Sequence, residues 1–122
     1  MSWEIYPEGL EAFLFRTYKE FGKKPIYVTE KGIAGKDTLL YGSVDDYCRI
    51  EYLRQHFSAA LNAIKGGVNL KGYFVWTLMD NFEWARGYSK RVGLVFVDYN
   101  NNDLKSIPKT SFEYYRDFIK TW

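Results

Sequence analysis

The sequence is poor in the residues that build disulfide frameworks and metal centres. Its 122 residues include one cysteine, Cys48, and one histidine, His56. A single cysteine cannot form an internal disulfide, and these two residues leave too few soft ligands for a zinc site. No metal and no other cofactor is therefore expected. We interpret His56, on the flank of a predicted helix, as a structural residue and Cys48 as a buried or half-buried free thiol.

An excess of one charge and long apolar runs are also missing. Lys and Arg total 17 against 15 Asp and Glu, a net charge of +2, so nothing in the bulk charge attracts nucleic acid or an anionic membrane. No stretch of 18 apolar residues, no apolar run of signal-peptide type and no Asn-x-Ser/Thr sequon occurs. These absences favour a cytoplasmic protein that binds neither nucleic acid nor membrane.

Aromatic residues are abundant. They make up 20% of the chain, with 4 Trp, 11 Tyr and 9 Phe, which is more than a small globular core requires. Flat rings that carry a polar edge suit stacking on sugars or a wet interface. The composition therefore indicates a globular protein with an aromatic binding surface.

Hydrophobic periodicity predicts alternating helices and strands. A helix is expected over 7–21, a second opens at Ser43 and ends before Gly66, and a third starts at Pro108. Strands are expected over 24–30 and 68–76, with a hairpin outside the main sheet formed by 92–99, the turn 100–103 and 104–107.

This order of elements predicts an α/β fold with parallel βα units. Two strands cannot close a barrel, and a full (β/α)₈ barrel takes roughly 250 residues. Both edges of a two-stranded sheet stay unpaired. We therefore expect residues 1–122 to form a single incomplete domain, part of a (β/α)₈ barrel.

Chemistry in such barrels collects where the strands end. Glu30 ends the first predicted strand and Trp76 the second, and Asp80, Glu83 and Trp84 follow in the next loop. Indole faces stack on pyranose rings, and carboxylates accept hydrogen bonds from sugar hydroxyls. Each residue also has a plain interpretation: Glu30 as a solvated loop residue, Trp76 as core, Asp80 as a turn or cap.

Three segments resemble the family 1 glycoside hydrolases, the β-glucosidase family. Residues 26–32, IYVTEKG, are similar to its Thr-Glu-Asn-Gly nucleophile motif. Residues 72–99, from GYFVWTLMDNFEW to GLVFVDY, resemble its second signature almost throughout, and 107–111, IPKTS, resembles its closing Pro-Lys-x-Ser segment. The likeness extends from about Trp3 to Phe118.

The resemblance implies a retaining β-glycosidase, of which this chain is the last quarter to third. It implies that Glu30 is the nucleophile, that Trp76 is the platform under the sugar, that Glu83 binds the hydroxyls at C4 and C6, and that Trp84 lies at the C3 side. A carboxylate at position 83 argues against the 6-phospho-β-glucosidase branch, because it would repel a phosphate.

The chain also departs from the family pattern. The acid/base Glu of that family lies in an Asn-Glu-Pro motif, and no Asn-Glu-Pro occurs here. Lys31 replaces the commoner Asn after the nucleophile, and the sequence leaves open whether it faces Glu30 or solvent. Met1-Ser2 ahead of mid-family sequence indicates a truncated chain. Little or no glycosidase activity is expected of the chain alone.

Three arrangements fit these features. In the first, the chain is part of a full enzyme, and the missing barrel portion supplies the acid/base to act on a β-glucoside or related β-glycoside. In the second, copies of the chain associate through their open strand edges. In the third, the chain is a non-catalytic sugar-binding module.

Overall fold

The computed structural model describes residues 4–121, and these divide into two compact units. Of the described residues, the first unit contains 4–31 and 52–75, and the second contains 32–51 and 76–121. Each unit has its own hydrophobic core. The single incomplete domain expected from the sequence stays a prediction.

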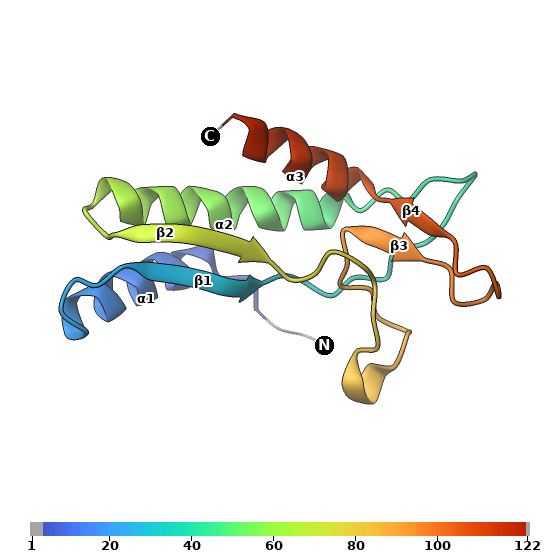
Figure 1. The fold of residues 1–122 in the computed structure, drawn as a ribbon, viewed down its shortest axis with the longest axis horizontal. Coiled ribbons are helices and arrows are strands. Elements are labelled where there is room, and N and C mark those ends of the chain that lie inside the picture. The colour runs from blue at the N-terminus through green and yellow to red at the C-terminus, as the bar shows by residue number, and fades with distance from the viewer. Residues whose placement is uncertain (1–3, 122) are drawn as a thin grey trace. The chain divides into compact units, whose positions relative to one another are not determined.

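The first unit contains two strands, each preceded by a helix. Helix α1 (Pro7–Glu20) precedes strand β1 (Ile26–Lys31), and helix α2 (Tyr47–Lys65), which enters this unit at Tyr52, precedes strand β2 (Leu70–Val75). The two strands lie side by side and run parallel, with Ile26 opposite Leu70 and Lys31 opposite Val75 (Figure 1). The expected parallel pairing of these two segments is confirmed.

The core of the first unit joins both helices to both strands. Leu14 from α1, Ala63 from α2 and Val68 before β2 are buried together. Partly buried side chains pack against them: Leu10, Tyr18, Ile26, Val28 and Leu70. The alternate strand positions Tyr27 and Phe74 are each 56% exposed, because successive side chains of a strand point to opposite faces. One face of the sheet is therefore packed and the other presents aromatic rings.

His56 belongs to this unit as a structural residue. Its ring is 1% exposed, Nδ1 lies 2.8 Å from the carbonyl oxygen of Tyr52, and the two rings stack with centroids 3.9 Å apart. Burial lowers the pKa of His56, Lys31 lowers it further, and the Tyr52 carbonyl and Glu8 oppose the shift. Burial also raises the pKa of Tyr52 to about 12. The imidazole is thus held neutral in the folded chain.

We expect the free energy of unfolding to decrease as pH is lowered below about 6.5, because of His56. Because the pKa is lower in the folded chain than in the unfolded one, its contribution is full above about pH 6.5 and is lost as pH falls through the folded value. The slope is at most about 1.4 kcal/mol per pH unit. Urea unfolding between pH 5.5 and 7.5 measures it. His56→Gln should flatten the slope, and an unchanged slope in that variant would refute the assignment.

The second unit contains an antiparallel hairpin and the last helix. Strand β3 (Val95–Val97) pairs with β4 (Ser106–Pro108), and helix α3 (Thr110–Lys120) follows. This hairpin forms a separate sheet from β1–β2, as expected from the sequence. Val44, Phe96 and Ile107 form the core, with Leu39 packed against them.

Several predicted details differ. Helix α2 begins at Tyr47 rather than Ser43, because Ser43 pairs with Leu40 in a short bridge and the Asp46 side chain accepts hydrogen bonds from Thr110 and Ser111 of α3. Tyr47, at the start of α2, is exposed. Cys48 is exposed rather than buried or half-buried. The hairpin strands are shorter than the apolar segments that predicted them.

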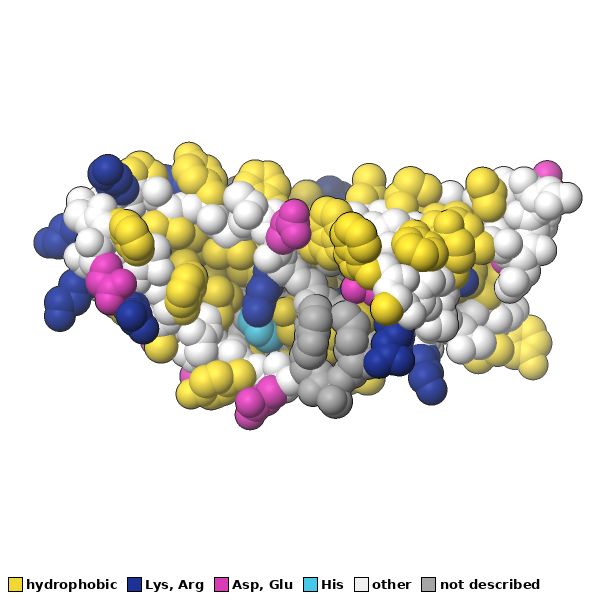
Figure 2. Space-filling view, turned by 90° about the horizontal axis from the view of Figure 1, so that it is seen from below, with side chains coloured by type: hydrophobic (Ala, Val, Ile, Leu, Met, Phe, Trp, Pro, Cys, Tyr) yellow, Lys and Arg dark blue, Asp and Glu magenta, His cyan; other side chains and the backbone are white. Residues whose placement is uncertain are grey.

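Large hydrophobic side chains reach the surface in many places. Figure 2 shows them spread over the face that it presents, and rings of Tyr, Phe and Trp are among them. Helices in the described part of the chain are all too short or too polar to cross a membrane. Exposed apolar area of this kind is typical of interaction surfaces.

Candidate functional site

Glu30 lies in a bulge at the end of β1. Val28 is opposite Tyr73 and Lys31 is opposite Val75, so three steps along β1 face two steps along β2. The extra residue disrupts the ladder between Val28 and Lys31, and the Glu30 side chain is exposed while Lys31 is half-buried. Bulges re-aim side chains and occur often beside active sites. The periodicity of the sequence gave no sign of this bulge.

Trp76 follows β2 directly and belongs to the second unit. Its side chain is 42% exposed. The alternative interpretation of Trp76 as a core residue is therefore wrong. Its carbonyl oxygen lies so close to Gly32 that a Cβ at that glycine would be 2.0 Å from it. Only glycine fits there, which accounts for Gly32 after the predicted nucleophile. The bond between Trp76 and Thr77 is cis.

Glu83 and Trp84 lie in a tight turn. The Glu83 amide donates to the carbonyl of Gly87 (2.9 Å), and the Gly87 amide donates to the carbonyl of Trp84 (3.1 Å), around the short 3₁₀ helix η1 (Trp84–Arg86). Glu83 is half-buried and Trp84 is 84% exposed. Trp84 has φ +42°, a backbone region that costs energy for a non-glycine residue. The turn thus holds an indole outward in a strained conformation.

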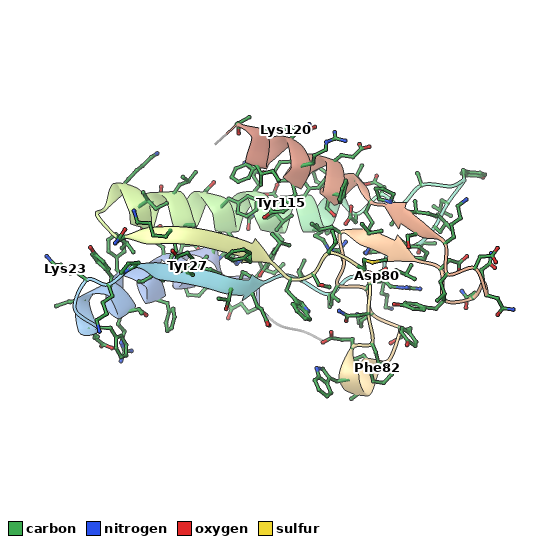
Figure 3. All side chains as sticks on the ribbon, in the orientation of Figure 1. Lys23, Tyr27, Asp80, Phe82, Tyr115 and Lys120 are labelled. Atoms are coloured by element: carbon green, nitrogen blue, oxygen red, sulfur yellow. The ribbon has the colours of Figure 1, made fainter. Side chains whose placement is uncertain are left out.

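The same loop carries a stack of aromatic rings. Phe82 meets Tyr88 edge to face with centroids 5.5 Å apart, and Tyr88 lies 4.0 Å from Tyr99. The Arg91 guanidinium lies over the Tyr99 ring, 5.2 Å from its centroid. Phe82 projects with the loop, away from Asp80 (Figure 3). These contacts stiffen the stretch that presents Glu83 and Trp84.

Asp80 is a buried structural residue rather than a ligand-facing acid. It is 2% exposed, and its Oδ1 accepts hydrogen bonds from the Gly93 amide (2.9 Å) and from Lys109 Nζ (2.7 Å). Arg91 Nη1 lies 3.4 Å from its Oδ2. Burial raises the pKa of Tyr99, whose hydroxyl donates to the Asp80 carbonyl. The carboxylate is therefore fully used inside the protein, which fits the plainer interpretation of a turn residue.

Lys109 is the residue that sequence reasoning missed. It is 0% exposed, and Nζ donates to Asp37 Oδ2 (2.6 Å), Asp80 Oδ1 (2.7 Å) and the carbonyl of Gly93 (2.6 Å). All three donor positions of the ammonium are satisfied. The only sign of it in the sequence is its place in the family-like segment 107–111, which by itself does not predict a buried lysine.

A second set of ion pairs continues from Lys109. Arg49 Nη1 lies 2.8 Å from Asp37 Oδ2 and also pairs with Asp46. Asp46 accepts hydrogen bonds from the amide of Ser111 (2.8 Å) and from the hydroxyl of Thr110 (3.2 Å). We call the whole set the ion cluster, and its members are Asp37, Asp46, Asp80, Arg49, Arg91 and Lys109.

The structure places the predicted site residues in both units. Glu30 is in the first, and Trp76, Glu83 and Trp84 are in the second. Within the first unit, Lys31 pairs with Val75, so the two strands that lead to Glu30 and Trp76 end at the same level. Among residues 4–121 no group of three or more His, Cys, Asp or Glu side chains is arranged to hold a metal ion.

Comparison with known proteins gives a consistent result. The sequence profile of Glycosyl hydrolase family 1 matches residues 1–122. The chain is 50% identical over 121 residues to a 1,4-β-D-glucan glucohydrolase of Thermotoga neapolitana, which covers 98% of this chain and 27% of that protein. It is 44% identical to a 6-phospho-β-galactosidase of Streptococcus equi subsp. zooepidemicus, over 25% of that protein.

Solved structures show the same relation. The family 1 β-glucosidase from Thermotoga maritima superposes with a TM-score of 0.94 at 48% identity, over 98% of this chain and 27% of that one. The chain therefore spans about a quarter of the length of these relatives, and its fold is part of a (β/α)₈ barrel. Because the family profile covers the chain from end to end, the chain belongs to glycosyl hydrolase family 1.

Proposed function

We propose that this chain carries the nucleophile and part of the sugar-binding surface of a retaining β-glucosidase. Glu30 attacks the anomeric carbon, Trp76 lies under the sugar ring, Glu83 accepts hydrogen bonds from the C4 and C6 hydroxyls, and Trp84 flanks C3. The bulge that carries Glu30 at the end of β1 is the observation that supports the proposal most. The exposure of both indoles supports it further.

Relatives with bound sugar analogues support the substrate class. Structures of the Thermotoga maritima β-glucosidase have been solved with isofagomine lactam and with glucoimidazole. The assignment of Glu83 and Trp84 to the sugar site rests on their places in the motif of residues 72–99. A glucose-like ring with free hydroxyls is the ligand that such a carboxylate and indole accommodate.

The reaction needs a second carboxyl group that this chain does not provide. Retention requires an acid/base about 5–5.5 Å from the nucleophile, and the Asn-Glu-Pro motif that holds it in the family is absent from the sequence. Losing a general acid typically lowers the rate by about 10²–10⁴-fold. The remaining barrel therefore supplies the acid/base, and the chain by itself hydrolyses β-glycosides little or not at all.

Complementation tests this proposal. The chain is mixed or fused with the part of the Thermotoga maritima β-glucosidase that it does not match, and hydrolysis of an aryl β-glucoside is measured. Activity that needs both parts is expected. The matched control is the same mixture with Glu30→Gln. No activity from a mixture shown by sedimentation to be associated would contradict the proposed role.

A self-associating, non-catalytic module is the second candidate function. The exposed rings of Tyr27 and Phe74 on the open face of the β1–β2 sheet favour it, since uncovered strands and apolar faces pair with other chains. Sedimentation of the isolated chain separates the two candidates. A stable dimer whose formation excludes the missing barrel part would favour the module.

Glu83 predicts the preference for unphosphorylated sugars. Some relatives are 6-phospho-β-galactosidases, and a carboxylate at this position repels a phosphate group at C6. We expect Glu83→Ser in the complemented enzyme to lower kcat/KM for an aryl β-glucoside and to raise it for the 6-phosphorylated analogue, each by about tenfold or more. Glu113→Ser on the exposed side of α3 is the control. An unchanged ratio would remove Glu83 from the sugar site.

A further inference from the structure

The loop that carries Glu83 and Trp84 has its two ends clamped by one buried ammonium group. Asp80 stands at the start of this loop and Gly93 at its end, and Lys109 Nζ binds Asp80 Oδ1 (2.7 Å) and the Gly93 carbonyl (2.6 Å). The Gly93 amide also donates to Asp80 Oδ1 (2.9 Å). Three hydrogen bonds therefore join the two ends at a single point.

Close backbone packing leaves this point little freedom. A Cβ at Gly93 would lie 2.2 Å from the amide nitrogen of Asp80 and 2.4 Å from the carbonyl carbon of Met79. Backbone hydrogen bonds from Asp80 to Val95 (2.9 Å) and from Val95 to Leu78 (2.8 Å) run beside it. The base of the loop is thus rigid, and a charged group lies at its centre.

Lys109 also connects this loop to the segment that follows β1. Its third hydrogen bond goes to Asp37 (2.6 Å), in the stretch that runs on from Gly32. Arg49 holds Asp37 from the other side, 2.8 Å away. In the ion cluster, three carboxylates face three basic groups, so Lys109 is held without an uncompensated charge.

We propose that Lys109 is a positioning residue for the sugar-binding loop. It joins Asp80 and Gly93 to each other and to Asp37. These contacts determine the position of the loop that carries Glu83 and Trp84. Nothing in this role needs Lys109 to touch the substrate. The inference rests on the proposed function for its consequence in sugar binding, and on the geometry of the second unit for the clamp itself.

Hydrogen exchange of the full 122-residue chain tests the clamp without any ligand. In Lys109→Met, the amides of Glu83 and Gly87 should exchange about 10- to 100-fold faster, because a charge-assisted contact at the loop base is lost. Asp98 donates to the carbonyl of Lys105 at the turn end of the β3–β4 hairpin. Its amide can exchange by local fraying that leaves the Lys109 contacts intact, so it should accelerate far less even though Lys109→Met also lowers the global stability. Lys105→Met, at an exposed lysine, is the matched control and should change neither set.

A second variant keeps this test decisive if Lys109→Met does not fold. Asp80→Asn preserves the size of the side chain and should also accelerate the Glu83 amide by roughly 10-fold relative to the hairpin amides. Equal acceleration of loop and hairpin amides in the variant that folds would mean only global destabilisation and would overturn the proposal. Unchanged loop exchange would overturn it as well.

A double-mutant cycle tests the consequence for sugar binding. In the complemented enzyme, Lys109→Met should raise KM for an aryl β-glucoside by about 10- to 100-fold when Glu83 is present and by less than about threefold in Glu83→Gln. The same factor in both backgrounds would show that Lys109 does not act through the loop. If the complemented enzyme is inactive, the proposed function fails, while exchange still decides the clamp.

Discussion

Lys109→Met should lower the free energy of unfolding of the chain by about 3–5 kcal/mol. The ammonium is 0% exposed and binds two carboxylates, Asp37 and Asp80. Methionine fills a similar volume but leaves the ion cluster with one uncompensated negative charge in a buried setting. Urea denaturation followed by circular dichroism measures the loss, which is large compared with the total stability of most domains.

Restoring the charge balance should recover part of this loss. In Lys109→Met combined with Asp80→Asn, one positive and one negative charge are removed together, so the double variant should be destabilised by less than the sum of the two single variants. Lys105→Met at an exposed position should stay within about 0.5 kcal/mol of the parent chain. A cost that small for Lys109→Met would show that the ion cluster contributes little.

Glu30→Gln should abolish the hydrolysis of aryl β-glucosides by the complemented enzyme. Glutamine keeps the size and the hydrogen-bonding reach of glutamate but cannot form the covalent glycosyl intermediate. In serine proteases, removing the catalytic nucleophile lowers kcat by roughly 10⁶-fold, and we expect a loss of roughly 10⁴- to 10⁶-fold here. Initial rates of aryl glucoside hydrolysis measure the loss.

Trapping of the intermediate identifies the same residue directly. A 2-fluoro glucoside with a good leaving group should label the complemented enzyme, and mass spectrometry should locate the sugar on the peptide that contains Glu30. Lys31→Asn, at the adjacent half-buried position, should change the rate only modestly. Full activity in Glu30→Gln, or a label on another peptide, would contradict the assignment.

Lys109 and the proposed nucleophile Glu30 belong to different units of the chain. Glu30 is on a strand of the first unit, whereas Lys109, Asp80 and Gly93 belong to the second. Lys109 should therefore affect KM more than the covalent step, because its connection runs through the loop with Glu83 and Trp84. Comparing the trapping rate with KM in Lys109→Met separates these two effects.

The local pattern of apolar and β-branched residues was sufficient to predict helix α1 and strand β1 of the first unit. The apolar spacing of residues 7–21 predicted α1, and the β-branched run before Lys31 predicted β1, each within a few residues of the observed bounds. The parallel pairing of β1 with β2 followed from the intervening helix. These features depend on neighbours in the chain, whose spacing and propensity can be read directly from the order of residues.

The motifs in the amino-acid order were enough to predict the family, the partial barrel and the candidate residues Glu30, Trp76, Glu83 and Trp84. The folded chain was needed to find that Asp80 is buried among basic groups, that Lys109 binds both Asp80 and Gly93, and that a bulge carries Glu30. These contacts join residues that are far apart along the chain. Lys109 lies 72 residues from Asp37 and 29 from Asp80, and whether a charged side chain is buried with a partner depends on which distant segments fold against it.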